Sequence, residues 1–345
     1  MVNVVITGGA GFLGSRLARE LLAACPLEVA GGEARPLSRM TLIDQAPVPP
    51  DLAADERVTA IRGDLVELLD PAAGGPGTLA IRGSGDKAEV IFHLAAAVSG
   101  ECEADFDLGI RANLRATEAL LASCRALGTS PLVVFSSSLA VFGGSGDHPL
   151  PEVVDDQTLP NPQTSYGAQK VIGEQLLADY TRKGFLRGRA LRLVSVSVRP
   201  GRPNAAASGF MSGIIREPLA GQRATCPVGP DTEVALASPA KAIAGLRCAA
   251  TASDQAWGGR SAVNLPALTI SVADMAAALS RIAGPQVSAL IDWIPDPEVA
   301  RMVASWPARV RADRAARLGL TPDPDFDSII RMHLAESRSG ADSGP

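Results

Sequence analysis

The sequence predicts an α/β protein in which a doubly wound parallel sheet precedes a smaller C-terminal domain. Short apolar runs rich in β-branched residues alternate with helical segments through the first 198 residues, as in sheets whose parallel strands are joined by crossover helices. A glycine-rich turn directly follows the first run. After Val198 this alternation stops. We therefore expect the larger domain over 1–198, with some later segments returning to its sheet, a second domain over 199–336 and a frayed tail over 337–345.

The composition excludes several classes of protein. With 345 residues, 46% of them apolar and 20% charged, the chain can bury a sizeable core and is not of the disordered type. Its net charge of −5 argues against a nucleic-acid or anionic-membrane surface as the main activity. Five scattered cysteines without Cys-x-x-Cys spacing indicate reduced thiols in a cytoplasmic protein, and three widely separated histidines indicate no metal site. Because Gly8 interrupts the apolar N-terminus, we expect neither a signal peptide nor a membrane span.

The first predicted strand, residues 2–7, runs into a glycine-rich turn, and a helix follows over 15–24. In this order, the turn lets the backbone approach a pyrophosphate closely, and the helix N-terminus offers unpaired N–H groups to it. A purely structural turn does not explain glycines at three such regular positions. The pattern predicts a Rossmann-type dinucleotide site, with cofactor contacts from Gly8, Gly11, Phe12, Leu13 and Gly14.

The second predicted strand, residues 40–44, ends in Asp44. A carboxylate at this point can accept hydrogen bonds from the ribose hydroxyls and repel a 2′-phosphate, which favours NAD over NADP. Asp44 follows Gly14 by 30 residues rather than the usual interval of about 20, and we attribute the excess to the connection 25–39. An ordinary turn-forming aspartate is the alternative interpretation.

The third and fourth predicted strands, 58–62 and 90–94, bring further candidates to the same edge of the sheet. Asp64 and Leu65 follow the third strand and could contact the adenine, because ligands of open α/β sheets bind beyond the carboxyl ends of the strands. Small residues after the fourth strand would let a ring or a ribose approach the backbone, so we expect contacts from Leu94, Ala95 and Ala96. His93 reads as a packed core histidine, and 71–85 as a surface loop.

Polar residues also stand on the next helix and strand. Asn113 lies early in a helix predicted over 107–127, where alone it says little. The fifth strand, 132–135, ends in Ser136, Ser137 and Ser138, which are placed either to bind a ligand or to form a turn. The triple run leaves open which serine would act.

Tyr166 and Lys170 are four residues apart on a helix predicted over 164–183, so they share one face. An ammonium beside a phenol favours the phenolate, which can then remove a proton from an alcohol near neutral pH. The chain has only two tyrosines and four lysines, so the pairing is rare by chance. A surface tyrosine packed on a lysine stem is the competing interpretation. A sixth strand is predicted over 191–198.

Together these motifs resemble the extended short-chain dehydrogenase/reductase family, whose features appear in the family's order over the first 200 residues. The resemblance implies an NAD-dependent enzyme in which Tyr166 removes the proton of a hydroxyl. Lys170 would lower the pKa of Tyr166 and bind the ribose, Ser138 would bind the reacting oxygen with Ser137 as its nearest rival, and Asn113 would hold Lys170 through a water. The matching stretches are 7–14, 63–65, 93–96, Asn113, 136–138 and the Tyr166–Lys170 pair.

A narrower resemblance, over nearly the whole chain, is to sugar-acid dehydrogenases of that family that oxidise a C2 hydroxyl with NAD. It implies a substrate carboxylate held by Arg199, Arg202 or Asn204, with Ser99 and Ser165 near the hydroxyls. Nucleotide-sugar epimerases of the family usually carry an asparagine and a Tyr-Gly pair where this chain has 195–199. A nucleotide-sugar epimerase or reductase, and a non-catalytic dinucleotide-sensing regulator, are the alternatives. We also expect a homodimer through the helices 107–127 and 164–183.

Overall fold

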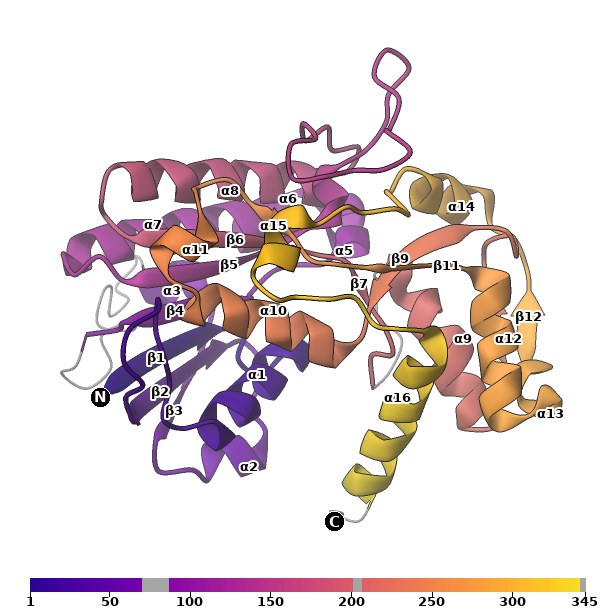
Figure 1. The fold of residues 1–345 in the computed structure, drawn as a ribbon, viewed down its shortest axis with the longest axis horizontal. Helices are drawn as coiled ribbons and strands as arrows, with labels where there is room; N and C mark the ends of the chain where they lie inside the picture. Colours follow the sequence, from indigo (N-terminus) through magenta and orange to yellow (C-terminus); the bar gives the residue numbers. More distant parts are fainter. Residues whose placement is uncertain (70–86, 201–206, 342–345) are drawn as a thin grey trace. The chain divides into compact units, whose positions relative to one another are not determined.

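The computed structural model describes residues 1–69, 87–200 and 207–341 (Figure 1). The chain forms two compact units, and each contains segments that are far apart in the sequence. The first comprises Met1–Val141, Thr164–Leu193 and Ile243–Asn264, and the second comprises Phe142–Gln163, Val194–Ala242 and Leu265–Pro345. The predicted loop over 71–85 lies outside the described residues. None of the helices in the described ranges has the length and hydropathy needed to span a bilayer.

A seven-stranded parallel sheet organises the first unit, in the order β10-β6-β5-β4-β1-β2-β3. From β1 the chain adds β2 and β3 on one side and β4, β5 and β6 on the other, which is the doubly wound arrangement predicted from the sequence. The fold class is therefore confirmed. The strands are β1 (Val2–Thr7), β2 (Leu37–Asp44), β3 (Val58–Arg62), β4 (Val90–His93), β5 (Leu132–Ser138), β6 (Arg187–Leu193) and β10 (Val263–Asn264).

Helices cover both faces of this sheet (Figure 1). The helices α7 (Ala116–Leu127) and α8 (Ser165–Arg182) lie on one face, and α1 (Phe12–Ala23) and α2 (Pro50–Ala53) lie on the other. Alternate residues of β5, such as Val133 and Phe135, pack with buried leucines of α7 and α8, because successive strand residues point to opposite faces. Other helices of this unit are α3 (Leu65–Leu69), α5 (Ser99–Ala104), α6 (Phe106–Gly109), η2 (Ile110–Arg115) and α11 (Asp254–Trp257), together with most of α10 (Pro239–Thr251).

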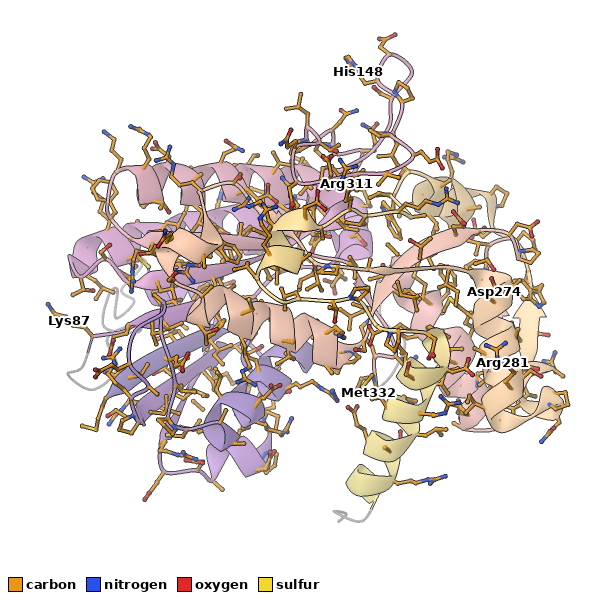
Figure 2. The ribbon with its side chains drawn as sticks, viewed as in Figure 1. Lys87, His148, Asp274, Arg281, Arg311 and Met332 are labelled. Carbon is orange, nitrogen blue, oxygen red and sulfur yellow. The ribbon has the colours of Figure 1, made fainter. Side chains whose placement is uncertain are left out.

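The second unit has its own core, built around two small sheets. Strand β9 (Glu233–Ala237) pairs in parallel with β7 (Ser195–Val196) and antiparallel with β11 (Leu268–Ser271). Strand β12 (Ile291–Trp293) pairs with β8 (Ala224–Cys226). Figure 2 shows Asp274 and Arg281 along α12, where Arg281 donates to Asp327 of α16 at 2.6 Å. The helices are α9 (Phe210–Leu219), α12 (Val272–Ala283), α13 (Pro285–Ser288), α14 (Pro297–Ala304), α15 (Asp313–Arg317) and α16 (Phe326–Ala341).

Several predicted boundaries were wrong. The sixth strand begins at Arg187 and ends at Leu193, whereas β7 beyond it joins another sheet; three arginines and a glycine in β6 hide its strand pattern. The fifth strand continues through Ser138, because its serines are paired with residues of β6. The tail predicted as frayed is helical through Ala341, and residues 342–345 lie outside the described range. The helix predicted over 107–127 contains the π-helical turn η2.

Candidate active site

The glycine-rich turn lies at the carboxyl end of β1, beside the point where the strand order reverses between β1 and β4. Gly8 has a φ of +73°, and its N–H donates to the carbonyl of Ile43 at 2.8 Å. A Cβ on Gly8 would lie 2.7 Å from the nitrogen of Ala95, and one on Gly14 would lie 2.0 Å from the oxygen of Gly8. These two glycines are required because the backbone of the turn packs against itself and against the end of β4.

Gly11 differs from the other two glycines. It is exposed, and a Cβ there would meet only the oxygen of Gly8, at 3.2 Å. It is also the N-cap of α1 and has no side chain to cover the first turn, which begins with Phe12 and Leu13. Packing within the protein requires this glycine least, so the uncovered helix N-terminus fits a bound anion such as the pyrophosphate of a dinucleotide. The turn thus fits the NAD that the sequence predicts.

Asp44 closes β2 next to this turn. Its carboxylate accepts the N–H of Ala10 at 3.0 Å and the N–H of Ala46 at 2.9 Å. Two backbone donors do not saturate a carboxylate, which offers about four acceptor positions. The half-buried Asp44 therefore has the capacity to accept ribose hydroxyls, as predicted for an NAD site.

Asp64 has protein partners on both oxygens. One oxygen accepts the N–H of Val66 at 2.8 Å, and the other accepts Nε of Arg111 at 3.0 Å. Arg111 comes from η2 and also pairs with Glu67, so it joins that turn to the end of β3. Leu65 begins α3 and is buried. The adenine contacts predicted for Asp64 and Leu65 remain predictions, and Arg111 was not foreseen.

A chain of hydrogen bonds links the end of β1 to η2 through His93. Thr117 Oγ1 donates to the carbonyl of Asn113 at 2.5 Å, so it accepts from Nε2 of His93 at 3.0 Å. His93 Nδ1 then accepts from Thr7 Oγ1 at 2.7 Å. Burial, aided by the charge of Lys170, lowers the pKa of His93 to about 3, so the ring is neutral at physiological pH. His93 is thus a buried core residue, as the sequence indicated.

The residues after β4 are bonded to Thr7, the first residue of this series of hydrogen bonds. The N–H of Leu94 donates to the carbonyl of Thr7 at 3.1 Å, and the N–H of Ala95 donates to Thr7 Oγ1 at 3.3 Å. Leu94 and Ala95 are half-buried and Ala96 is exposed, so all three lie at the edge of the sheet where the glycine turn ends.

Asn113 is buried, and its amide is committed to protein partners. Its Oδ1 accepts the N–H of Ala97 at 2.8 Å, while Nδ2 donates to the carbonyl of Ala97 at 3.2 Å and to Oε1 of Gln169 at 2.7 Å. The two bonds to Ala97 determine the orientation of the amide. Asn113 thereby joins the segment after β4 to α8, and its predicted contact with Lys170 through a water remains a prediction.

Lys170 and Tyr166 lie on one face of α8. Lys170 Nζ donates to the carbonyl of Ser136 at 2.9 Å and lies 5.5 Å from the centre of the Tyr166 ring. Burial lowers the pKa of Lys170 to about 8, while the neighbouring Cys102 and Glu174 act in the opposite direction. Tyr166 is half-buried in the first turn of the helix, after the N-cap Thr164. The predicted pair is therefore together in space, with the ammonium beside the phenol ring.

The three serines at the end of β5 have different partners. Ser136 Oγ donates to the carbonyl of His93 at 3.0 Å, and Ser137 Oγ donates to Glu174 Oε1 at 2.5 Å. Ser138 Oγ instead accepts the N–H of Ala140 at 3.1 Å and is half-buried. Only the Ser138 hydroxyl retains its proton for donation to a ligand, which favours Ser138 over Ser137 as the residue that binds the reacting oxygen.

The predicted substrate residues are divided between the two units. Ser99 is the first residue of α5 and Ser165 the first of α8, and both are half-buried in the first unit. Arg199 belongs to the second unit, where its Nη2 donates to Ser208 Oγ at 2.9 Å and its N–H donates to Ser212 Oγ at 3.0 Å. Arg202 and Asn204 lie outside the described residues.

The sequence interpretation missed two groups near the site. Glu174 and Arg192 form a buried ion pair next to Ser137, and Gln169 bonds Asn113. A signal was available for the pair. Glu174 follows Lys170 by four positions on the same helix, and an arginine in a buried strand requires a partner.

Comparison with known proteins agrees with this geometry. Residues 4–234 match the NAD-dependent epimerase/dehydratase family. The D-erythronate dehydrogenase of Cupriavidus necator is 48% identical over 337 residues, which cover 97% of this chain and 99% of the relative. The D-erythronate dehydrogenase of Haemophilus influenzae is 37% identical over 334 residues, covering 96% and 99%.

Solved structures share the fold over almost the whole chain. A nucleoside-diphosphate-sugar epimerase from Agrobacterium tumefaciens is 38% identical, with a TM-score of 0.84 and coverage of 98% of this chain and 95% of that one. An L-threonine dehydrogenase from Clostridium difficile has a TM-score of 0.80 at 21% identity, with 97% of each chain covered. The latter likeness concerns the fold alone.

Proposed function

This chain belongs to the NAD-dependent epimerase/dehydratase family, and we propose that it is an NAD-dependent dehydrogenase that oxidises the C2 hydroxyl of a small sugar acid. D-erythronate, oxidised to 2-dehydro-D-erythronate, is the proposed substrate. The observation that carries the proposal is the Lys170 ammonium beside the Tyr166 ring, at the sheet edge that also bears the glycine turn. The 48% identity to a D-erythronate dehydrogenase supports the substrate.

Residues of the first unit have two roles: some accept the proton of the substrate hydroxyl, and others bind the oxygen that loses it. Tyr166, as phenolate, accepts the proton of the C2 hydroxyl, and Lys170 stabilises that phenolate by its charge. Ser138 donates to the reacting oxygen from the end of β5. Bound NAD would supply the acceptor for the hydride that leaves C2. The turn from Gly8 to Gly14 would hold its phosphates and Asp44 its ribose.

The substrate carboxylate would be held by Arg199, with Arg202 and Asn204 as the other candidates. A guanidinium offers a planar pair of donors to a carboxylate, which the ammonium of a lysine does not. Ser99 and Ser165 would bind the remaining hydroxyls. If Arg199 has this role, Arg199→Lys should raise KM for the sugar acid about tenfold and leave KM for NAD unchanged. An unchanged sugar-acid KM removes Arg199 from the site.

A nucleotide-sugar epimerase is the second candidate, because the Agrobacterium protein that is 38% identical is named as a nucleoside-diphosphate-sugar epimerase. An epimerase returns the hydride to its substrate, so it releases no net NADH, whereas a dehydrogenase accumulates NADH with each turnover. The absorbance of NADH should rise with NAD and D-erythronate, and stay flat with UDP-sugars. NADP with D-erythronate is the control for cofactor choice. Product formation from a UDP-sugar without release of NADH would favour the epimerase. If no four- to six-carbon aldonic acid led to NADH formation, the dehydrogenase would be refuted.

The proposed enzyme is a cytoplasmic homodimer. The five cysteines are thiols rather than halves of disulfides, in keeping with a reducing compartment. Large apolar side chains are exposed on α6 and α8, where Phe106 is 61%, Leu108 40% and Ile172 42% accessible. Exposed apolar side chains on these two helices favour contact with a second copy of the chain. Light scattering in solution tests the dimer, and Ile172→Asp together with Phe106→Asp should yield a monomer.

A further inference from the structure

Glu174 forms a buried cluster with two residues of neighbouring strands. Ser137 of β5 and Arg192 of β6 are cross-strand partners, and both face α8. Ser137 Oγ donates to Glu174 Oε1 at 2.5 Å, while Arg192 donates through Nε at 2.8 Å and through Nη2 at 2.7 Å. None of the three residues is more than 5% exposed. Both oxygens of the carboxylate therefore accept hydrogen bonds, and the group is kept from water.

The cluster lies next to Lys170. Lys170 precedes Glu174 by one helical turn and bonds the carbonyl of Ser136, the neighbour of Ser137. Two side chains one turn apart on α8, one cationic and one anionic, thus bind the end of β5 just before Ser138. Tyr166 stands one turn earlier on the same face.

Besides Tyr166 and Glu174, two titratable groups near Lys170, His93 and Cys102, are neutral at physiological pH. His93 on β4 has its pKa lowered to about 3 by burial, and burial raises the pKa of the Cys102 thiol on α5. Cys102, when it is a thiolate, and Glu174 raise the pKa of Lys170 against the larger effect of burial. Arg192, on β6, neutralises part of the Glu174 charge. Because the raised pKa of Cys102 keeps that thiol neutral, Glu174 rather than Cys102 is the anion at neutral pH.

We propose that Glu174, held by Arg192 and Ser137, is a positioning residue that keeps the buried Lys170 ammonium charged. The inference rests on the proposed function, because a charged Lys170 matters for Tyr166 acting as the base. Without the Glu174 charge, burial would drive Lys170 toward its neutral form, and the phenolate of Tyr166 would lose its stabilising neighbour. The Glu174–Arg192 pair then serves the chemistry as well as the packing of α8.

A purely structural ion pair makes a different prediction. Removing either partner of a buried pair leaves an uncompensated charge and destabilises the fold in the same way. The two removals have opposite effects on Lys170, however. Glu174→Gln takes away an anion and should lower the pKa of Lys170, whereas Arg192→Met leaves the anion uncompensated and should raise it. The sign of the change therefore separates the electrostatic role from the structural one.

The titration of Lys170 can be followed directly by NMR of protein labelled with ¹³C at lysine Cε. The chain has only four lysines, so four signals are expected, and Lys170→Arg identifies the one that disappears. We expect a shift on the order of one pH unit downward in Glu174→Gln and a smaller upward shift in Arg192→Met. Asp179→Asn is the matched control, because it removes an exposed carboxylate from the same helix and should leave Lys170 unchanged.

Equal titration in wild type and both variants, or shifts in the same direction, would overturn the proposal. If the single variants do not fold, the double variant Glu174→Gln/Arg192→Met removes both charges and leaves none unpaired. In the double variant the pKa of Lys170 should still be lower than in the wild type. We expect the loss of Glu174 to outweigh the loss of Arg192, because Glu174 lies one turn from Lys170 on the same helix. A wild-type titration in the double variant would also overturn the proposal.

Turnover supplies an independent readout. At about pH 8 the charged fraction of Lys170 should fall from about one half to about one tenth in Glu174→Gln, so kcat should fall about fivefold with KM for NAD unchanged. A lowered Lys170 pKa with unchanged kcat would show that the charge of Lys170 does not support Tyr166 as the base. Failure of the proposed function has a separate signature: the wild type would not reduce NAD with any aldonic acid, although the NMR titrations, which need no substrate, would still behave as stated.

Discussion

The glycine turn after β1 and the charged face of α8 prepare one site by opposite means. The turn depends on missing side chains: Gly8 and Gly14 allow close packing, and Gly11 leaves the start of α1 uncovered. The face of α8 depends on side chains that are expensive to bury, above all Lys170 and Glu174. Backbone N–H groups do not titrate in the physiological range, whereas a buried lysine does. The first region should therefore respond to added volume, and the second to pH and charge.

The largest effect is expected at Tyr166. Tyr166→Phe removes the proton acceptor and leaves the turn untouched, so kcat should fall about 10³-fold while the Kd for NAD changes little. Steady-state kinetics and NAD titration by calorimetry measure the two quantities. Turnover near that of the wild type would contradict the role of Tyr166.

Lys170 should cost stability at neutral pH. Its pKa in the folded protein is lowered to about 8 from 10.5, so the unfolded chain binds the extra proton between these values. Stability therefore rises as pH increases through this window and the cost is fully present below it. Lys170→Met should be stabilised relative to wild type at about pH 7, and the difference should shrink by about 3 kcal/mol by about pH 10.

Denaturant unfolding of both proteins at the two pH values measures this difference. The comparison of the two proteins cancels every group that they share. A difference independent of pH would show that Lys170 is not perturbed by burial.

Gly14→Ala should damage the turn through volume alone. The new Cβ would lie 2.0 Å from the oxygen of Gly8, and overpacking of this kind costs about 1–3 kcal/mol. We expect weaker NAD binding by about tenfold or more, a lower Tm and an unchanged pH dependence of the remaining activity. Gly146→Ala is the control, because a Cβ there meets nothing within 4 Å. A shifted pH dependence of activity in Gly14→Ala would contradict the expectation that the glycine turn responds to added volume alone.

The smallest expected effect is on cofactor choice at Asp44. Asp44→Ser removes a carboxylate that accepts the N–H of Ala10. The same carboxylate would repel the 2′-phosphate of NADP. The ratio of kcat/KM for NAD to that for NADP should fall about tenfold, or roughly 1.4 kcal/mol, mainly by loss of NAD binding. The ratio is measured with D-erythronate under both cofactors. An unchanged ratio would leave Asp44 as a residue that only supports the turn.

The sequence alone determined the parts of the protein that depend on local order. The first strand, the glycines from Gly8 to Gly14 and the helix after them are adjacent in the chain, so their geometry can be predicted from neighbours. Tyr166 and Lys170 meet because four residues make one helical turn. The alternation of strands and helices then predicted the doubly wound sheet.

Only the tertiary structure decided which serine remains available, where β6 begins and what holds Lys170. Ser137 differs from Ser138 because Glu174 and Arg192, 37 and 55 positions further along the chain, come together on its side of the sheet. The arginines of β6 are compatible with a buried strand only because each has a distant partner. Arg189 pairs with Asp254, and Arg192 pairs with Glu174. Pairings over such separations follow from how strands and helices pack, so a local pattern can indicate that Arg192 needs a partner but not which residue supplies it.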